Sequence, residues 1–316
     1  MEIVIAVLVG LVFPTILFST IRKSADPDLT RPDQPTSVEQ ETTLSESTEI
    51  RVLTQGNEVI TMDLDAYLLG VILAEMPAEF EPEALKAQAV VSRTYTLRKS
   101  KVSGKHSNAD VCSNSSCCQG YCAEDEYIST GGSQDMVEKV RKAVTATSGE
   151  VLYYAGELIE ATYFSCSGGM TEDAQAVWGA DVPYLQAIQS PGEEIATHYV
   201  DTVTFSASEF CNLLSLDAEG NPEQWVESLT YTNGGGVDTI RLCGQNFKGT
   251  DLRARLGLRS TAFFITAVGD TVTITTKGFG HRVGLSQYGA EAMALQGATY
   301  EQILSHYYKG VTLGPM

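Results

Sequence analysis

The chain has 316 residues, with 21 basic and 40 acidic side chains and a formal net charge of −19. This length allows one large domain or two ordinary ones, and it excludes a small module held together by disulfides. The negative charge repels nucleic acid and anionic lipid headgroups, so we exclude a nucleic-acid-binding protein. A polymer that is recognised through hydrogen bonds and stacking remains compatible with this charge.

The first 21 residues, MEIVIAVLVGLVFPTILFSTI, are almost wholly apolar. About 20 such residues can cross a bilayer as a helix, which predicts a transmembrane signal anchor at 1–21. A cleaved signal peptide is the alternative, but no clear A-x-A site follows and the apolar stretch exceeds a usual signal-peptide core. Arg22 and Lys23 follow the stretch and no basic residue precedes it, so the positive-inside rule alone would place the following domain in the cytoplasm.

Residues 22–48 are rich in Pro, Ser, Thr, Asp and Glu and have almost no large apolar side chains, so we expect a disordered linker there. The pattern changes at residue 49, and we expect one folded domain over 49–316. It opens with IRVLTQGNEVITMDL, which predicts two short strands around a turn at Gln55-Gly56-Asn57.

Two helices are predicted next. Apolar residues at helical spacing in DLDAYLLGVILAEM indicate a helix that Pro77 ends, which places Glu75 on its last turn. The second helix begins near Pro82 and runs through EALKAQAVVSRTYTLRKS, with Arg93 near its middle. Because Glu75 is flanked by apolar side chains, partial desolvation would raise its pKa toward the working pH, which suits a proton donor. The alternative is an ordinary glutamate that pairs with a nearby Lys or Arg.

The rest of the chain mixes helices and strands irregularly. We expect a helix near 134–147, strands in GEVLYYAGELIEATYFS, a loop-rich stretch over 168–194, strands at 236–247 and 262–277, and two final helices separated at Gly297. This order predicts an α+β fold, with mixed helices packed on a strand-rich body.

A cysteine-rich segment, HSNADVCSNSSCCQGYC, follows the second predicted helix. Its histidine and thiols are dense enough to form a tetrahedral zinc site. Outside the cytosol, Cys112 could instead form a disulfide with Cys118 or Cys122. Farther along the chain, Cys211 and Cys243 are candidates to pair with each other.

Three separated blocks resemble one known family. LDAYLLGVILAEMPAEFEPEALKAQAVVSRTYTLR resembles the signature of the stage II sporulation protein D family, in which AEMP precedes EALKAQAV-x-x-RTY. ATYFSCSGGMTEDAQAVWGADVPYLQAIQSP is similar to the middle motif of that family, and GFGHRVGLSQYGAEAMALQGATYEQILSHYYKG is similar to its C-terminal motif. The blocks stand in the family's order and cover most of residues 50–313.

The resemblance implies a lytic transglycosylase. Such an enzyme would cleave the bond between N-acetylmuramic acid (MurNAc) and N-acetylglucosamine (GlcNAc) in peptidoglycan strands stripped of stem peptides, leaving 1,6-anhydro-MurNAc ends, during engulfment in sporulation. Glu75 matches the family's catalytic acid, which protonates the glycosidic oxygen and then accepts the proton of the C6 hydroxyl as that oxygen closes on C1. The second carboxylate of a hydrolase is then unnecessary, because the substrate supplies the nucleophile.

The resemblance also implies substrate contacts. Arg93 matches a family arginine that would hold the Glu75 carboxylate or bind a sugar or lactyl oxygen, with a structural salt bridge as the alternative. Gln186 stands where family members often carry Lys, which weakens any expectation of charge there. A tight turn at Ser167 and core positions in the C-terminal motif are the alternative structural roles. The full set of expected contacts is Arg93, Ser167, Tyr184, Gln186, His281, Gln287 and Tyr288.

Some family members bind zinc through His-x5-Cys-x4-His-Cys in the position of the cysteine-rich segment. By that resemblance the ligands here would be His106, Cys112, Cys117 and Cys118, with Cys117 in place of the second histidine. Four protein ligands leave no open position for a reacting water, so the ion would be structural and the chemistry would need no cofactor.

The expected partners are peptidoglycan glycan strands and, by resemblance, the stage II sporulation proteins M and P. The expected location is that of a single-pass membrane protein whose catalytic domain lies outside the cytoplasm, between mother cell and forespore. The alternative function is a non-catalytic peptidoglycan-binding enhancer of a partner amidase, although the retained AEMP segment argues against it. A zinc amidase is disfavoured because no His-Glu-x-x-His pattern occurs among the four histidines.

Overall fold

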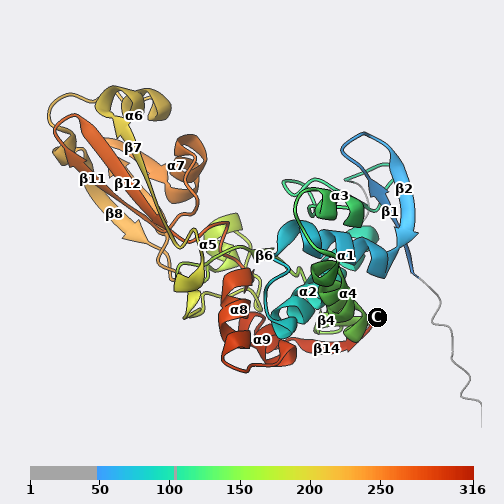
Figure 1. The fold of residues 1–316 in the computed structure, drawn as a ribbon. Helices are drawn as coiled ribbons and strands as arrows, with labels where there is room; N and C mark the ends of the chain where they lie inside the picture. Colours follow the sequence, from blue (N-terminus) through green and yellow to red (C-terminus); the bar gives the residue numbers. More distant parts are fainter. Residues whose placement is uncertain (1–47, 103–104) are drawn as a thin grey trace, which may run out of the picture. The chain divides into compact units, whose positions relative to one another are not determined.

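The computed structural model describes residues 48–102 and 105–316, which form a mixed α+β structure (Figure 1). The predicted anchor at 1–21 lies outside these residues, as does the predicted linker at 22–48 except for its last residue. Within the described ranges, no helix combines the length and the apolar character needed to span a bilayer. This finding contradicts the expected location as a single-pass membrane protein, and we assign no membrane location.

The described chain opens with a β-hairpin. Strands β1 (Glu49–Leu53) and β2 (Val59–Asp63) pair antiparallel, and the short strand β3 (Val111–Cys112) adds to β1 in parallel. The predicted turn is confirmed, and Asn57 adopts the left-handed conformation in it, with a φ of 64°. Asparagine tolerates that conformation better than most residues, since its short polar side chain can bond locally.

The first two helices follow directly, as predicted. Asp63 caps helix α1 (Leu64–Glu75), because its carboxylate accepts hydrogen bonds from the backbone N–H groups of Asp65 and Ala66. The helix ends at Glu75, directly before Met76 and Pro77. Helix α2 (Pro82–Lys101) has its proline in the first turn, where the missing N–H costs nothing. Both helices are buried over most of their length, and α4 (Gln134–Ala146) packs one apolar face, with Val137, Val140, Ala143 and Val144, into the same core.

Arg93 joins these three helices and is fully buried. Its guanidinium donates to the backbone oxygens of Thr147 at 2.7 Å and Val144 at 3.2 Å, at the carboxyl end of α4, and to Asp65 Oδ1 at 3.0 Å. A cation is favourable at that end of a helix because the last carbonyl groups have no partner within the helix. Arg93 therefore has the structural role that the sequence left as an alternative.

The middle and C-terminal motifs come together on the same side of α2. Strand β4 (Glu150–Tyr154) lies between β5 (Glu157–Leu158) and the final strand β14 (Thr312–Pro315), and β6 (Tyr163–Phe164) pairs in parallel with β13 (Leu285–Ser286). The two predicted final helices are confirmed as α8 (Gln287–Leu295) and α9 (Tyr300–Tyr307). Three shorter helices complete this part: α3 (Glu124–Ser129), α5 (Ala174–Trp178) and the 3₁₀ helix η1 (Glu193–Ile195).

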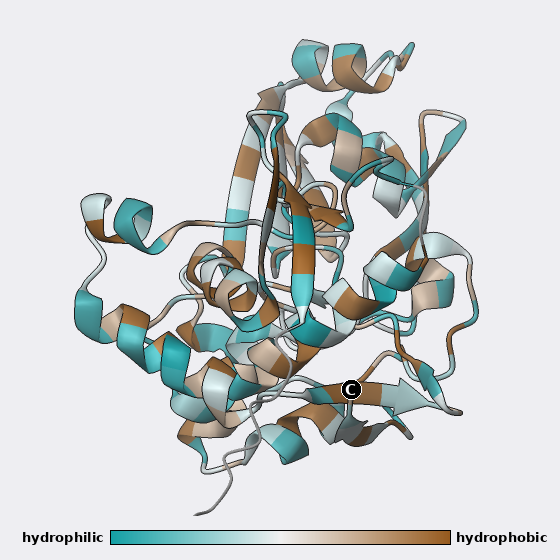
Figure 2. Ribbon diagram, turned by 90° about the vertical axis from the view of Figure 1, so that its right-hand side faces the viewer, coloured by the Kyte–Doolittle hydropathy of each residue, from teal (hydrophilic) through white to brown (hydrophobic). Residues whose placement is uncertain are grey.

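Residues 200–277 have a hydrophobic core of their own, and we call them the insertion. They contain two antiparallel three-stranded sheets, in the orders β10-β9-β8 and β11-β12-β7. The elements in chain order are β7 (Val200–Ser206), α6 (Ala207–Leu214), η2 (Pro222–Gln224), β8 (Val226–Tyr231), β9 (Val237–Leu242), β10 (Gln245–Lys248), α7 (Gly249–Leu256), β11 (Phe263–Val268) and β12 (Thr271–Lys277). In Figure 2 teal and brown alternate along the long strands, as expected where one face of a strand is buried. Val200 and Lys277 lie opposite each other in the ladder, so the chain enters and leaves the insertion at neighbouring positions.

The region 236–247, which was predicted as strand, contains a turn. Cys243 and Gly244 have φ values of 46° and 79°, and they form the tight turn between β9 and β10. Two residues with positive φ match the twist of a hairpin, but the usual sequence signal is Asn-Gly or Asp-Gly, and Cys-Gly gave no such indication.

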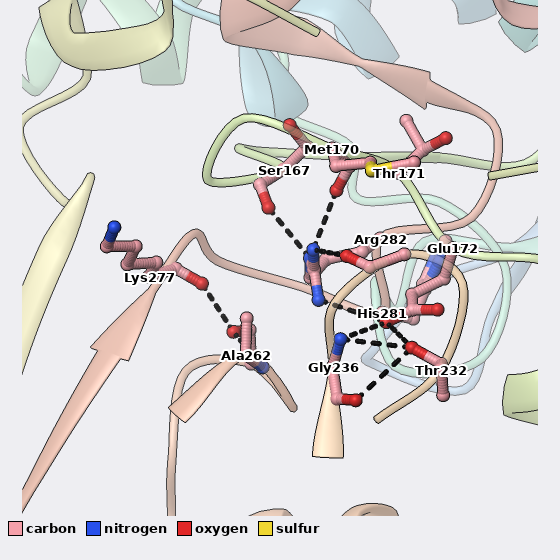
Figure 3. A network of polar contacts seen from close by, with 12 residues as sticks. Ser167, Met170, Thr171, Glu172, Thr232, Gly236, Ala262, Lys277, His281 and Arg282 are labelled. Atoms are coloured by element: carbon pink, nitrogen blue, oxygen red, sulfur yellow. Dashed lines mark hydrogen bonds and ion pairs between the residues drawn. The ribbon is translucent and has the colours of Figure 1, made fainter. Parts of the chain in front are cut away.

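A buried ion pair attaches the insertion to the rest of the protein (Figure 3). Arg282 Nη1 and Glu172 Oε1 are 3.1 Å apart, and their side chains are only 2% and 1% exposed. The Arg282 guanidinium also donates to the backbone oxygens of Ser167, Met170 and Gly234, each at 2.7 Å. Glu172 Oε1 in turn accepts from Gly236 N at 2.9 Å and from Thr232 Oγ1 at 2.8 Å, in the loop between β8 and β9.

Replacing Arg282 by Met should lower the free energy of unfolding by about 3–5 kcal/mol, because Glu172 would remain buried without its cation. Arg241→Met is the matched control, since Arg241 pairs with Glu227 on an exposed part of the insertion and its loss should have little effect. Urea unfolding of both variants measures the difference. Equal losses in the two variants would show that the buried pair does not hold the insertion in place.

Candidate active site

A cavity of about 1120 Å³ lies beside the carboxyl end of α1. It is somewhat larger than the range of about 300–1,000 Å³ typical of pockets for drug-sized ligands, so it has room for more than one sugar unit. Its walls come from α1, α2, the segment 115–118, the surroundings of β6, the start of α8 and, from the insertion, α7. Six aromatic residues line it: Tyr95, Tyr163, Phe164, Trp178, Phe279 and Tyr288.

The structure brings half of the expected catalytic and substrate-binding residues together. Glu75, His281, Gln287 and Tyr288 all line the cavity, although they come from the first and last motifs of the sequence. The other four lie elsewhere: Arg93, Ser167, Tyr184 and Gln186 are not among the lining residues.

Glu75 is the last residue of α1, and its side chain is partly buried at the cavity wall. The backbone N–H of Gly120 donates to its Oε1. Burial raises the pKa of the Glu75 carboxyl above the ordinary value, and the hydrogen bond from Gly120 opposes this shift only in part. A Cβ at position 120 would lie 2.9 Å from Oε1, so a larger residue there would displace the Glu75 carboxylate from this position.

The cations that could have neutralised Glu75 are used elsewhere. Lys86 Nζ bonds Glu83 Oε1 at 2.6 Å, and Arg93 bonds Asp65. Glu75 is therefore not held as one half of the ordinary ion pair that the sequence left open as an alternative. Its raised pKa keeps the acid form populated at a higher pH than that of an exposed glutamate.

A second carboxylate in the cavity, that of Glu160, was not anticipated. Arg98 Nε bonds its Oε2 at 2.9 Å, and Lys99 Nζ bonds its Oε1 at 2.7 Å. Burial alone would raise the pKa of Glu160, but Lys99 and Arg98 outweigh this effect and hold the pKa below the ordinary value. Both carboxylate oxygens are thus occupied, and Glu160 is fixed in its ionised form.

His281 lies among aromatic rings at the cavity wall. Its ring centre is 5.2 Å from that of Trp178 and 5.6 Å from that of Phe164, and its Nδ1 accepts from Val283 N at 3.1 Å. Burial, together with the charge of Arg253, lowers the pKa of His281 to about 4. The ring is neutral at physiological pH, so His281 contributes a polar aromatic surface rather than a charge.

Gln287 and Tyr288 open α8 at the cavity edge. The Tyr288 ring packs edge-on against Phe80 with 5.0 Å between the ring centres, and the backbone N–H of Tyr288 donates to Ser165 O at 3.0 Å. Gln287 Nε2 lies 3.5 Å from Gln88 Oε1 on α2, a long contact that leaves the amide free to turn toward a ligand.

Three expected substrate contacts have structural partners instead. Ser167 is fully buried, and its hydroxyl donates to Glu193 Oε1 at 2.8 Å. The Tyr184 hydroxyl accepts from Glu160 N at 2.9 Å, so Tyr184 supports a cavity residue without reaching the cavity. Gln186 is exposed, bonds Pro183 O at 2.7 Å and lines a separate, smaller cavity.

The cysteine-rich segment forms a compact cluster of possible metal ligands. One ligand atom from each of His106, Cys112, Cys117 and Cys118 lies within 4.8 Å of all the others. His106 Nε2 is 3.4 Å from Cys118 Sγ and 3.7 Å from Cys117 Sγ. In a tetrahedral zinc site, bonds of about 2.0–2.3 Å place neighbouring ligand atoms roughly 3.5–3.8 Å apart, so this donor set fits the ion. All seven cysteines lie in the described part of the chain, and each is a free thiol, including Cys211 and Cys243.

Comparisons with known proteins agree with the resemblance of the motifs. A family model described as stage II sporulation protein matches residues 53–154, a range that contains Glu75 and the cysteine cluster. The stage II sporulation protein D of Bacillus amyloliquefaciens is 39% identical over 265 residues, which cover 82% of this chain and 76% of that protein. The protein of the same name from Bacillus subtilis (strain 168) is 37% identical over 286 residues, covering 89% and 83%. The chain belongs to the stage II sporulation protein D family.

A further relative has a different name. The amidase enhancer of Bacillus subtilis (strain 168) is 29% identical over 299 residues, which cover 78% of this chain but only 40% of that longer protein. Membership of the family associates the chain with sporulation.

The Glu75→Gln variant should be more stable than the wild type at neutral pH. Burial raises the folded-state pKa of Glu75 above its unfolded-state pKa. The contribution of this carboxyl to stability is therefore complete below the unfolded-state pKa, where it is protonated in both states, and is lost as the pH rises through the folded-state pKa. Glutamine cannot ionise, so the advantage of the variant should disappear near pH 4, about the ordinary pKa of glutamate. Urea unfolding at both pH values measures it, with Glu79→Gln in the exposed loop as the control. A variant that is less stable at neutral pH would mean that the site favours the carboxylate.

Proposed function

We propose that this protein is a peptidoglycan lytic transglycosylase, a lyase that cleaves the MurNAc-GlcNAc bond of denuded glycan strands during engulfment in sporulation. The observation that carries the proposal is Glu75, a carboxyl with a raised pKa at the wall of a cavity large enough for a glycan, with no paired cation among residues 48–102 and 105–316. Family membership supports the cell-wall context.

The proposed reaction uses the same carboxyl twice. Glu75 in its acid form donates its proton to the glycosidic oxygen, and the bond from that oxygen to C1 of MurNAc breaks. The C6 hydroxyl of the same MurNAc then attacks C1 and gives its proton to the Glu75 carboxylate. One product is a 1,6-anhydro-MurNAc end, the other is a GlcNAc hydroxyl, and Glu75 returns to its acid form. Gly120 holds the carboxyl by one hydrogen bond throughout.

The environment of Glu160 supports an intramolecular nucleophile over hydrolysis. A hydrolase needs a second carboxylate that attacks C1 or activates water. Glu160 is the other carboxylate that lines the cavity, but Arg98 and Lys99 occupy both of its oxygens and lower its basicity. We assign Glu160 to shaping the cavity.

The aromatic walls support a carbohydrate ligand. Trp178 and Phe279, which are 47% and 38% exposed, both line the cavity and present aromatic surface to it. The flat C–H faces of pyranose rings pack on such aromatic surfaces, while hydroxyl and amide groups bond to polar side chains such as Gln287.

Glu75→Gln should lower the rate of glycan cleavage by about 100- to 10,000-fold, the usual contribution of a general acid. The test incubates the full-length wild type, Glu75→Gln and the control Glu79→Gln with denuded glycan strands and identifies the products by mass spectrometry. We expect anhydro-MurNAc ends from the wild type and from Glu79→Gln, but not from Glu75→Gln. Reducing ends would mean hydrolysis, and Glu160→Gln would then be examined.

The name of the amidase-enhancer relative favours one alternative, a non-catalytic module that binds peptidoglycan and stimulates a partner amidase. In that case Glu75→Gln would bind strands and stimulate the amidase as well as the wild type does, and neither protein would cleave. Association with the stage II sporulation proteins M and P is part of our main proposal, by family resemblance.

We further propose a structural zinc site. His106, Cys112, Cys117 and Cys118 would hold the ion, which would supply stability and no reacting water, because four protein ligands close the coordination shell. Cys117 and Cys118 also line the cavity, and Gly120, the donor to Glu75, follows two residues later. The four ligands thus fix the segment that orients the catalytic carboxyl.

Cys118→Ser should lose bound zinc and unfold at a lower temperature than the wild type, because one of the four ligands is weakened and the fold of the segment depends on the ion. Cys122→Ser is the control, since Cys122 lies outside the cluster and bonds Ala123 O. Elemental analysis of the purified proteins gives the zinc content. Wild-type protein without zinc, and with a melting temperature that a chelator does not change, would refute the site.

A further inference from the structure

Arg253 has an unusual position for a cation. It lies on α7 of the insertion and lines the cavity. Its Nε is buried and, among the described residues, has no hydrogen-bond partner. Burial lowers the pKa of the guanidinium, yet arginine remains charged at any physiological pH. A buried N–H donor without an acceptor is costly, which points to an acceptor that arrives with the ligand.

The other basic residue in the cavity wall differs in this respect. Lys99 is neutralised by Glu160, which Arg98 also contacts. Arg253 forms no ion pair with any acidic residue in the described part of the chain. Its positive charge is therefore available to a ligand, whereas that of Lys99 is not.

Arg253 is also not needed to hold its helix. Leu252 and Leu256, 0% and 5% exposed, anchor α7 in the core of the insertion. Arg255, two positions along, bonds Leu214 O at 3.2 Å and lies over the Phe247 ring. Arg253 lies close enough to His281 for its charge to lower the pKa of that ring, so the cation is next to the aromatic wall where a sugar would stack.

We propose that Arg253 is an anion subsite that binds the lactyl carboxylate of a MurNAc residue from which the stem peptide has been removed. This inference rests on the proposed function and names the group that selects the substrate. A single guanidinium matches a single carboxylate, through two parallel hydrogen bonds. A stem peptide converts that carboxylate into a neutral amide and adds bulk, so Arg253 would distinguish denuded strands from peptide-bearing ones.

A polyanion is a poorer match for this subsite. The whole chain carries a formal charge of −19, which opposes the approach of a polymer with many phosphates. A denuded glycan has one carboxylate for every two sugars, and its other contacts are neutral. The cavity offers the same combination, with one free cation among the described lining residues beside aromatic surfaces.

The test measures binding rather than cleavage, in full-length protein carrying Glu75→Gln so that no ligand is consumed. The two ligands are a GlcNAc-MurNAc tetrasaccharide with free lactyl carboxylates and the same tetrasaccharide with lactyl carboxamides. Titration calorimetry should show that the carboxylate form binds about 10- to 100-fold more tightly, as expected for hydrogen bonds to an ionised group. Added Arg253→Gln should reduce the affinity for the carboxylate form to that for the carboxamide form, whereas added Arg255→Gln should keep the preference.

Equal binding of the two ligands to protein with Arg253 intact would overturn the subsite, and this arm needs no variant at position 253 to fold. A preference that survives Arg253→Gln would also overturn it. The proposed function is tested separately. If the wild type binds the carboxylate form selectively but does not cleave glycan strands, the subsite is supported and the proposed enzymatic function is overturned. If it cleaves the strands without this selectivity, the function is supported and the subsite is overturned.

Discussion

The arrangement of the cavity depends on the buried ion pair of Arg282 and Glu172. Arg282 belongs to the C-terminal motif and Glu172 to the middle motif, and both bond the loop between β8 and β9 of the insertion. His281, the preceding residue, lines the cavity, so the pair that attaches the insertion also positions part of the cavity wall. Burying a charge pair costs desolvation free energy, and this cost is offset here because almost every lone pair and N–H group of the pair takes part in a hydrogen bond. Glu172 Oε2 is the exception, with no partner among the described residues.

The local structure around Glu75 was predictable from the sequence because short-range rules govern it. A capping aspartate, an apolar helical run and Pro77 define α1, and they leave Glu75 at its end. Long-range partners were not predictable. Arg93 occupies a position in a helix that fits a catalytic role equally well, and only the packing of α4 against α2 reveals that it caps a helix. Glu160 and Arg253 lie in no motif, so their place in the cavity emerges only when the insertion and β6 come together.

The Glu75 carboxyl, our proposed general acid, and the cysteine cluster contact one short stretch of backbone. Cys118 is a candidate ligand, and Gly120 donates to Glu75 and permits its close approach. The spacing of two residues means that a shift in the cluster moves the donor as well. A structural ion of this kind can therefore affect the reaction without touching the substrate, since a general acid depends on its geometry as much as on its pKa.

The insertion begins and ends at residues that face each other, Val200 and Lys277, and it has its own core. The part that carries the proposed acid therefore does not depend on the insertion for its own hydrophobic core. Two recombination events, one at each of these neighbouring junctions, would exchange the whole insertion, together with the side chain at position 253, and leave α1 and Glu75 unaltered. The proposed anion subsite would then change with a whole module rather than by point substitution.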